Sequence, residues 1–332
     1  MTHPPRIGVV GVGHLGALHA KMLAELPQVH LAGVFDTDGT KAQRCALECG
    51  TRAFPSLDAL SAECDALTIA TPTSTHFQVA AHALRNGRHV FIEKPITQTL
   101  EEADALIRLA REYDALIQVG HIERFNAAIL SVEQHYMIDP LFVESHRLSS
   151  FHPRGTDVAV VLDLMIHDID IILSIVQSPV VRVDANGVAV VSDSVDIANA
   201  RLQFENGCVA NVTASRISQK KMRKMRLFQK DAYISIDFLD KQAEVFRLVG
   251  DDEPPAKEAM MLGQIESAKR RRNIVYEMPP VQDVNALKYE LELFARAITT
   301  HTPPPVTGEE GRRALEVAHM ILERINEQTV KW

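Results

Sequence analysis

Residues 6–16, with the sequence RIGVVGVGHLG, decide the fold of this chain. The short apolar strand Arg6–Val10 runs into a turn that matches the pattern G-x-G-x-x-G, and an amphipathic helical pattern follows as far as Pro27. In this motif the glycines allow a tight turn, close approach to a pyrophosphate, and close packing of helix on strand. The helix N-terminus adds free amides and partial positive charge. The residues predicted to hold the phosphates are Gly11, Gly13, His14, Leu15 and Gly16.

A second predicted strand, residues 30–35, ends at Asp36. This acid follows Gly16 by the interval of about 20 residues that is typical of dinucleotide sites. Its carboxylate can accept hydrogen bonds from a ribose 2′-hydroxyl and would repel a 2′-phosphate. The next residues are Thr37 and Asp38, so no arginine directly follows. The order of strand, turn, helix and acid therefore predicts NAD as the cofactor, in preference to NADP.

Strands and helices alternate as far as residue 120. The predicted strands after Asp36 are 65–69, a run ending at Lys94, and 115–119, with helices between them. This β-α alternation predicts a doubly wound parallel sheet with helices on both faces, a Rossmann domain over residues 1–120.

The pattern changes beyond Gly120, where successive segments alternate apolar and polar residues. Glu205-Asn206-Gly207 is a hairpin turn between two of them. We expect a second α/β domain over residues 121–332, with a large, mostly antiparallel open sheet. Residues 251–280 are charged and contain prolines, so a long loop is expected there. Two helices are expected at the end of the chain, at 283–299 and 309–326, and they could pack against the first domain. The predicted strands are 141–149, 180–191, 194–204, 208–217, 226–229, 232–238 and 243–248.

A charged pair ends the apolar run Val90–Ile92, since Glu93 and Lys94 lead directly into Pro95. Pro95 lacks a backbone donor and fixes its own φ, so the strand should stop there. Lys94 is then placed at the carboxyl end of a buried strand, where α/β sheets gather ligands. Holding an ammonium there costs desolvation energy, which indicates a binding or chemical role.

Asp163 and His167 lie four residues apart, on one face of a predicted helix. A histidine with a pKa near neutral can take a hydroxyl proton as hydride leaves, and Asp163 would orient it or hold a substrate hydroxyl. The alternative is a core histidine hydrogen-bonded to Asp163. A metal site built from His167, Asp168 and Asp170 is disfavoured because consecutive residues point in different directions and no second histidine lies at a ligand spacing. No metal is expected.

Composition limits the possible classes of protein. At 332 residues the chain is long enough for two domains, and its net charge of −8 argues against nucleic acid as the main partner. Ionisable residues interrupt the most apolar long run, 158–176, so no membrane span is expected. No signal peptide fits before the first strand. A cytoplasmic protein with reduced thiols is expected, because no C-x-x-C pair occurs. The cysteines are Cys45, Cys49, Cys64 and Cys208.

These motifs, in this order along nearly the whole chain, resemble the Gfo/Idh/MocA oxidoreductases. The resemblance implies a Rossmann domain and a C-terminal domain whose open sheet face makes dimers or tetramers. It implies Lys94, Asp163 and His167 as the catalytic group, and an NAD site close to Glu93. One departure is Val160-Val161, where many members are glycine-rich. A further motif that carries the resemblance, also implied to lie near the cofactor, is the loop with Thr71, Pro72, Thr73 and His76.

Within that family, segments 120–126 and 161–168 are most similar to nucleotide-sugar 3-dehydrogenases. Those enzymes oxidise UDP-N-acetylglucosamine to a 3-keto sugar for a following aminotransferase, in amino-sugar (lipid A) biosynthesis. Arg124 and Asn126 offer a charge and an amide suited to a sugar or diphosphate. Arg216 begins the basic run 216–226, which could also meet the diphosphate; the alternative is a solvated turn.

Two other functions stay open. A dehydrogenase of a free polyol or sugar, such as inositol, would share every catalytic residue and differ only in the substrate segments at Arg124 and Arg216. A dinucleotide-dependent sensor or binding protein would be expected to have lost Lys94 or His167, and both are present.

Overall fold

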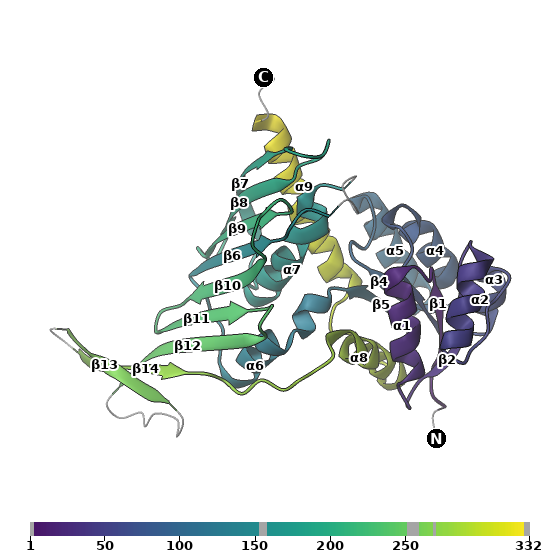
Figure 1. Cartoon of the computed structure of the whole chain (residues 1–332), viewed down its shortest axis with the longest axis horizontal. Helices are drawn as coiled ribbons and strands as arrows, with labels where there is room; N and C mark the ends of the chain where they lie inside the picture. The colour runs from purple at the N-terminus through teal and green to yellow at the C-terminus, as the bar shows by residue number, and fades with distance from the viewer. Residues whose placement is uncertain (1–2, 153–157, 251–258, 268–269, 329–332) are drawn as a thin grey trace. The chain divides into compact units, whose positions relative to one another are not determined.

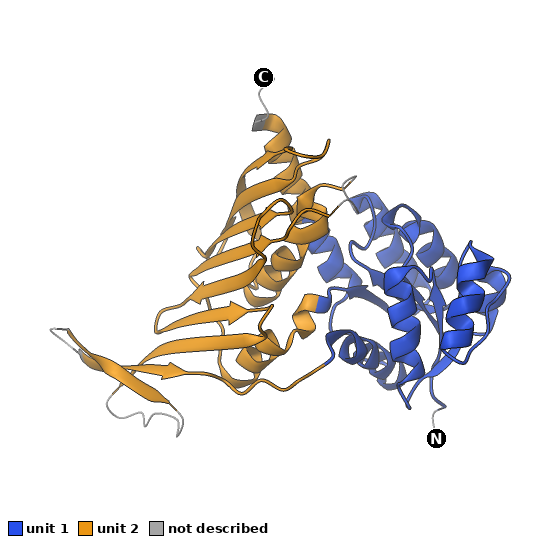
Figure 2. Ribbon diagram, in the orientation of Figure 1, with its two compact units in different colours: residues 1–122, 285–316 blue, residues 123–284, 317–332 orange. Residues whose placement is uncertain are grey.

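The computed structural model describes residues 3–152, 158–250, 259–267 and 270–328. The chain divides into two compact units (Figure 2). The first unit combines residues 1–122 with 285–316, and the second combines 123–284 with 317–332.

The first unit is built on a parallel sheet, and its described strands have the order β2-β1-β3-β4-β5 (Figure 1). The order reverses between β1 and β3, the kind of switch point beside which doubly wound folds bind ligands. The predicted Rossmann architecture is confirmed. The strands are β1 (Arg6–Val10), β2 (His30–Phe35), β3 (Ala66–Ile69), β4 (His89–Glu93) and β5 (Ile117–Gly120).

Several helices of the first unit begin at a residue whose side chain caps the helix. Asp38, Ser56 and Thr99 accept hydrogen bonds from backbone amides at the starts of α2, α3 and α5. Helix α8 comes from the far end of the chain, and its Phe294 joins the same core as Leu23 of α1. The helices are α1 (His14–Ala24), α2 (Gly39–Glu48), α3 (Leu57–Ala62), α4 (Thr73–Arg85), α5 (Leu100–Glu112) and α8 (Ala286–Thr300).

The described strands of the second unit form one sheet with the order β13-β14-β12-β11-β10-β6-β9-β8-β7. Its pairs are antiparallel except β6 with β9, so the predicted mostly antiparallel sheet is confirmed. The strands are β6 (Phe142–Leu148), β7 (Val180–Val188), β8 (Ile197–Phe204), β9 (Val209–Ser215), β10 (Met222–Phe228), β11 (Ala232–Asp237), β12 (Gln242–Val249), β13 (Met260–Ser267) and β14 (Arg270–Glu277).

Alternation along these strands separates two faces of the sheet. Val143 and Leu227 are fully buried, whereas their neighbours Phe142 and Phe228 are partly exposed. Helices α6 (Ala127–His135) and α7 (Ile166–Ile175) contact the sheet (Figure 1). The last helix, α9, spans Gly308–Gln328. No helix within the described segments is long and apolar enough to cross a bilayer.

Two local predictions were wrong. The loop expected over 251–280 contains the hairpin β13–β14, while residues 251–258 lie outside the described part of the chain. Apolar residues such as Met260 and Val275 are typical of strands. The consecutive arginines at 270–272 interrupt the alternation of apolar and polar residues by which a strand is predicted. Strand β10 also begins earlier than expected, at Met222, inside the basic run.

Candidate active site

The three glycines of the first turn meet different surroundings. Gly11 has φ +82°, and a Cβ there would lie 2.7 Å from Cγ2 of Thr71. A Cβ on Gly16 would lie 1.7 Å from the carbonyl oxygen of Gly11. Gly13 is the exception, because no described atom lies within 4 Å of where its Cβ would be. The fold itself therefore requires Gly11 and Gly16, whereas Gly13 leaves space for a ligand to approach the backbone, as a pyrophosphate does in this motif.

Helix α1 starts at this turn, with Gly13 as its N-cap. Among the described residues no side chain caps the first amides of the helix, so they are available to an anion. His14 and Leu15 are the first two helical residues, and both are exposed, Leu15 at 47%. These residues fit a dinucleotide whose phosphates meet the amides.

Asp36 is tied to the glycine turn. Its Oδ2 accepts a hydrogen bond of 2.8 Å from the Val12 amide, and its Oδ1 accepts one of 2.8 Å from the Asp38 amide. The carboxylate is therefore oriented before any ligand binds, and each oxygen keeps a lone pair for a ribose hydroxyl. This geometry fits the predicted role of Asp36.

The loop before α4 is held from inside by His76, which is 1% exposed. Its Nε2 lies 2.9 Å from the carbonyl oxygen of Thr71, and its Nδ1 lies 2.9 Å from that of Pro95. Burial lowers the pKa of His76, opposed by these carbonyls and by the charge of Glu93. His76 was predicted to contact the cofactor, but both of its ring nitrogens are directed at backbone. The more accessible residues of the loop are Thr71, Pro72 and Thr73.

Glu93 is the last residue of β4, and the peptide bond between Lys94 and Pro95 is cis. Oε1 of Glu93 lies 2.8 Å from Nε2 of His19, a histidine of α1 that is fully buried. Lys94 is half-buried at the carboxyl end of the strand, as predicted from Pro95. Sequence reasoning missed His19; the available signal was a polar residue at a sheet-facing position of an amphipathic helix.

In the second unit, Asp163 and His167 belong to one continuous helical segment. Asp163 lies in a π-helical turn, Val161–Met165, and His167 is the second residue of α7. A regular α-helix was expected, so the predicted geometry is corrected here. Both side chains are half-buried, whereas Ile166 and Ile169 beside them are fully buried. π-turns of this kind occur often at functional sites.

Arginines bind both of the following acids of α7. Arg147, 2% exposed, donates from Nε and Nη2 to Asp168 over 2.8 and 2.9 Å. Arg124 donates to Asp170 over 2.7 and 2.6 Å. Arg124 was predicted to meet substrate, and in the structure its guanidinium forms an ion pair with α7 through Asp170. Among the described residues, no group of three His, Cys, Asp or Glu side chains could hold a metal ion.

Asn126 and Arg216 are also used inside the second unit. Asn126 caps α6 by accepting from the Ala128 amide over 3.1 Å, and it donates to the carbonyl of Phe238 over 3.0 Å. Arg216 is 5% exposed and donates to the carbonyl of Val158. These contacts account for two polar groups that were predicted to meet substrate. The cap on α6 is local, but a spacing pattern cannot reveal Phe238 and Val158 as partners, because they lie 112 and 58 residues away in sequence.

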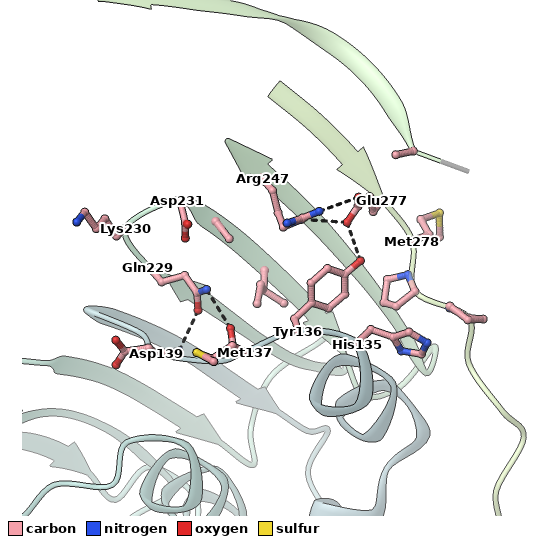
Figure 3. A pocket seen from close by; sticks show the side chains of 15 residues that line it. His135, Tyr136, Met137, Asp139, Gln229, Lys230, Asp231, Arg247, Glu277 and Met278 are labelled. Carbon is pink, nitrogen blue, oxygen red and sulfur yellow. Dashed lines mark hydrogen bonds and ion pairs between the residues drawn. The ribbon is translucent and has the colours of Figure 1, made fainter. Parts of the chain in front are cut away.

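A cavity of about 610 Å³ lies in the second unit beside the ends of α6 and β14 (Figure 3). Its charged groups satisfy one another: Arg247 pairs with Glu277 at 3.2 Å, and the Tyr136 hydroxyl donates to Glu277 over 2.9 Å. Burial and this carboxylate raise the pKa of Tyr136. None of the predicted site residues is among the described residues that line the cavity.

Comparison with known proteins agrees with this geometry. Residues 5–121 match the family model described as "Oxidoreductase family, NAD-binding Rossmann fold", and residues 111–235 match the "GFO/IDH/MocA C-terminal domain". The chain is 43% identical to UDP-N-acetylglucosamine 3-dehydrogenase of Acidithiobacillus ferrooxidans, over 94% of this chain and 95% of the relative. A solved structure of that enzyme superposes with a TM-score of 0.87, at 40% identity, covering 98% of this chain and 99% of the other.

A more distant relative is scyllo-inositol 2-dehydrogenase (NAD(+)) of Bacillus subtilis, at 29% identity over 66% of this chain and 69% of the relative. The two family models match in order, and the glycine turn and Asp36 have the geometry that a dinucleotide requires. The chain therefore belongs to the Gfo/Idh/MocA family of oxidoreductases, and its first domain is an NAD-binding Rossmann domain.

Proposed function

We propose that this protein oxidises the C3 hydroxyl of UDP-N-acetylglucosamine to a ketone, with NAD as the hydride acceptor. The observation that carries the proposal is the 43% identity, along 94% of the chain, to an enzyme named for that reaction. The inositol dehydrogenase relative is less similar and is matched over a shorter part of the chain.

The first unit would bind the cofactor. The backbone at Gly13 and the first amides of α1 would hold the pyrophosphate, and Asp36 would accept hydrogen bonds from the adenosine ribose. When bound, NAD supplies the ring that accepts hydride. The position of Lys94 at the carboxyl edge of the same sheet supports its role in the chemistry.

Three side chains would carry the proton and the charge. His167 takes the proton of the C3 hydroxyl while the C3 hydrogen leaves as hydride, and the C–O bond becomes a carbonyl. Lys94 donates a hydrogen bond to that oxygen, which stabilises the negative charge that develops there. Asp163 orients His167 or holds a neighbouring hydroxyl. General-base help of this kind contributes about 10²–10⁴ in rate.

A second candidate is the oxidation of a free polyol or sugar of the inositol type. Three contacts inside the second unit support this second candidate. Arg124, Asn126 and Arg216 were expected to recognise the nucleotide, and each of them is hydrogen-bonded to another part of the second unit. A free polyol requires none of them. Both candidates use the same Lys94, Asp163 and His167.

The two candidates are separated by initial rates. Purified protein is incubated with NAD and with one of UDP-N-acetylglucosamine, other UDP-sugars, myo-inositol or scyllo-inositol, and NADH is followed by absorbance. NADH formation with UDP-N-acetylglucosamine supports the proposal, and formation only with an inositol replaces it by the second candidate. A protein that binds NADH and reduces NAD with none of these compounds would fit the sensor alternative.

The proposal extends to assembly and to a downstream reaction. Dimers or tetramers would form through the outer face of the large sheet, and a half-exposed stripe of aromatic rings supports this; neighbouring rings are tilted, with centroids 5.0–5.8 Å apart. The stripe consists of Phe142, Phe228, Tyr233, Phe246 and Tyr276.

A 3-keto nucleotide sugar is the substrate class of an aminotransferase, which would continue amino-sugar and lipid A synthesis. The cysteines of the described chain are free thiols, which fits a cytoplasmic location.

A further inference from the structure

Buried histidines contact the chain on both sides of Lys94. Before it, Glu93 Oε1 lies 2.8 Å from Nε2 of His19; after it, the Pro95 carbonyl lies 2.9 Å from Nδ1 of His76. The two histidines come from different helices, α1 and α4, and are 0% and 1% exposed. We call these two contacts the Lys94 clamp.

The His19 contact leaves Glu93 little room to move. The ring of His19 packs edge-on against Phe91, with centroids 5.3 Å apart and an interplanar angle of 80°. On the neighbouring strand the carboxyl group passes close to Gly120, where a Cβ would come within 3.1 Å of it. A carboxylate that is both hydrogen-bonded and sterically enclosed holds one rotamer, and it fixes the end of β4 that leads into Lys94.

The His76 contact joins the other side of Lys94 to the nucleotide-binding turn. The Nε2 atom of the same ring meets the carbonyl of Thr71, whose methyl group packs against Gly11. A carbonyl can only accept, so a neutral ring serves one of the two oxygens and a doubly protonated ring serves both. In both forms the buried ring lies between the turn after Lys94 and the loop that borders the glycine motif, within 2.9 Å of a carbonyl oxygen of each.

We infer that His19 and His76 are positioning residues that hold the Lys94 ammonium at a fixed place relative to the NAD-binding turn. The inference rests on the proposed function, because it assumes that Lys94 takes part in hydride transfer. The reason is geometric: α1 contributes both His19 and the phosphate-binding N-terminus, and His76 joins the Thr71 loop to Pro95. Misplacing a reacting group by about 1 Å can cost about 10² in rate.

The first test compares three substitutions of His19. In His19→Gln the side-chain amide nitrogen can still donate to Glu93, whereas His19→Asn is too short and His19→Leu has no donor. We expect His19→Leu to lower kcat by about 10-fold to 10²-fold, with the Kd for NADH unchanged, and His19→Gln to restore most of kcat. His19→Asn should resemble His19→Leu, and it provides a polar variant if the leucine variant does not fold. Equal kcat in all three variants would overturn the inference.

The second test asks whether the effect passes through Lys94. In a Lys94→Ala background, adding His19→Leu or His76→Leu should leave the residual kcat unchanged, because the group being positioned is already absent. A further loss as large as in the wild-type background would contradict a positioning role. His82→Leu is the matched control for His76→Leu, because His82 lies on the same helix and pairs with Asp58. It should keep wild-type kcat.

A third measurement needs no sugar substrate, so it separates failure of the clamp from failure of the proposed function. Lys94 is labelled with an amine-selective reagent, and the rate of labelling is read by mass spectrometry. The rate at Lys94 should change in His19→Leu and in His76→Leu, while the rate at exposed Lys41 stays the same. An unchanged rate at Lys94 would overturn the inference even if a substrate is found. Absence of turnover in the wild-type protein would refute only the proposed function.

Discussion

Arg147 and Asp168 form a two-point ion pair in the interior of the second unit, with N···O distances of 2.8 and 2.9 Å and both side chains 2% exposed. Glu123 accepts a third hydrogen bond from the same guanidinium over 2.9 Å. Asp168 directly follows His167, so this pair fixes the start of the helix that carries the proposed base. The pair therefore holds in place the helix start that contains the proposed base.

Removing this guanidinium should strongly destabilise the protein. Arg147→Met leaves Asp168 buried without the guanidinium that pairs with it, while Glu123 keeps its ion pair with Arg223. Breaking a buried pair in this way typically costs about 3–5 kcal/mol. Urea unfolding measures the loss. The matched control is Arg226→Met, because Arg226 is an exposed arginine of the same sheet that pairs with Glu144 at 3.4 Å. An exposed pair contributes about 1 kcal/mol or less, so similar losses in both variants would contradict the account.

The glycines of the first turn should separate folding from binding. Gly13→Ala places its methyl group in open space, so the Tm should stay near the wild-type value. The same methyl group would obstruct the pyrophosphate, and the Kd for NADH should rise by at least about tenfold, equivalent to about 1.4 kcal/mol. Gly16→Ala should fail to fold, because its Cβ would lie 1.7 Å from the Gly11 carbonyl oxygen. Wild-type NADH affinity in Gly13→Ala would show that the cofactor binds elsewhere.

The proposed catalytic pair should act on turnover and not on cofactor binding. Lys94→Ala and His167→Ala are each expected to lower kcat by about 10²–10⁴, the range for general acid–base groups. NADH affinity, measured by fluorescence titration, should change little. His82→Ala is the control, because this half-buried histidine pairs with Asp58 and is none of the proposed site residues. Wild-type turnover in His167→Ala near neutral pH would assign the base to another group.

His89 should make folding sensitive to acid. Its Nδ1 accepts a hydrogen bond of 3.0 Å from the Leu116 amide, which a proton on Nδ1 would abolish. Burial, helped by nearby His301, lowers the pKa of His89 in the folded state. The unfolded chain, with an ordinary pKa of about 6.5, then binds the proton first. Stability is therefore full above pH 6.5 and falls as the pH drops toward the folded-state pKa.

This prediction is tested by urea unfolding of the wild type and of His89→Asn at about pH 5 and about pH 8, on either side of the ordinary imidazole pKa. The wild type should lose more free energy of unfolding at the lower pH than the variant does. At the higher pH the variant should be close to the wild type in stability, because Oδ1 of the asparagine can accept from the Leu116 amide in place of Nδ1. An identical pH dependence in both proteins would contradict the assignment.

The sequence predicted best what depends on local pattern. The glycine turn, Asp36 and the strand that stops at Pro95 follow from backbone rules that apply within a few residues, and each was found where expected. Strands buried on both faces appear in the sequence as apolar runs, which is why the parallel sheet could be predicted.

Long-range pairing could not be predicted. Arg124 and Arg216 looked like ligand-binding cations because a sequence does not say which acid or carbonyl will reach them. In the structure they meet Asp170 and the carbonyl of Val158. The same limit hid the contact between His19 and Glu93, which are separated by 74 residues. The hairpin β13–β14 was missed for a local reason, because its arginines obscure the alternation.

The most direct measurement is the initial rate of NADH formation by the wild-type protein and by Lys94→Ala, with UDP-N-acetylglucosamine and NAD as substrates. The account predicts turnover by the wild type, identification of a 3-keto nucleotide sugar by mass spectrometry, and a loss of rate of about 10² or more in the variant. Absence of NADH formation by a folded wild-type protein that binds NADH, or an undiminished rate in Lys94→Ala, would contradict it.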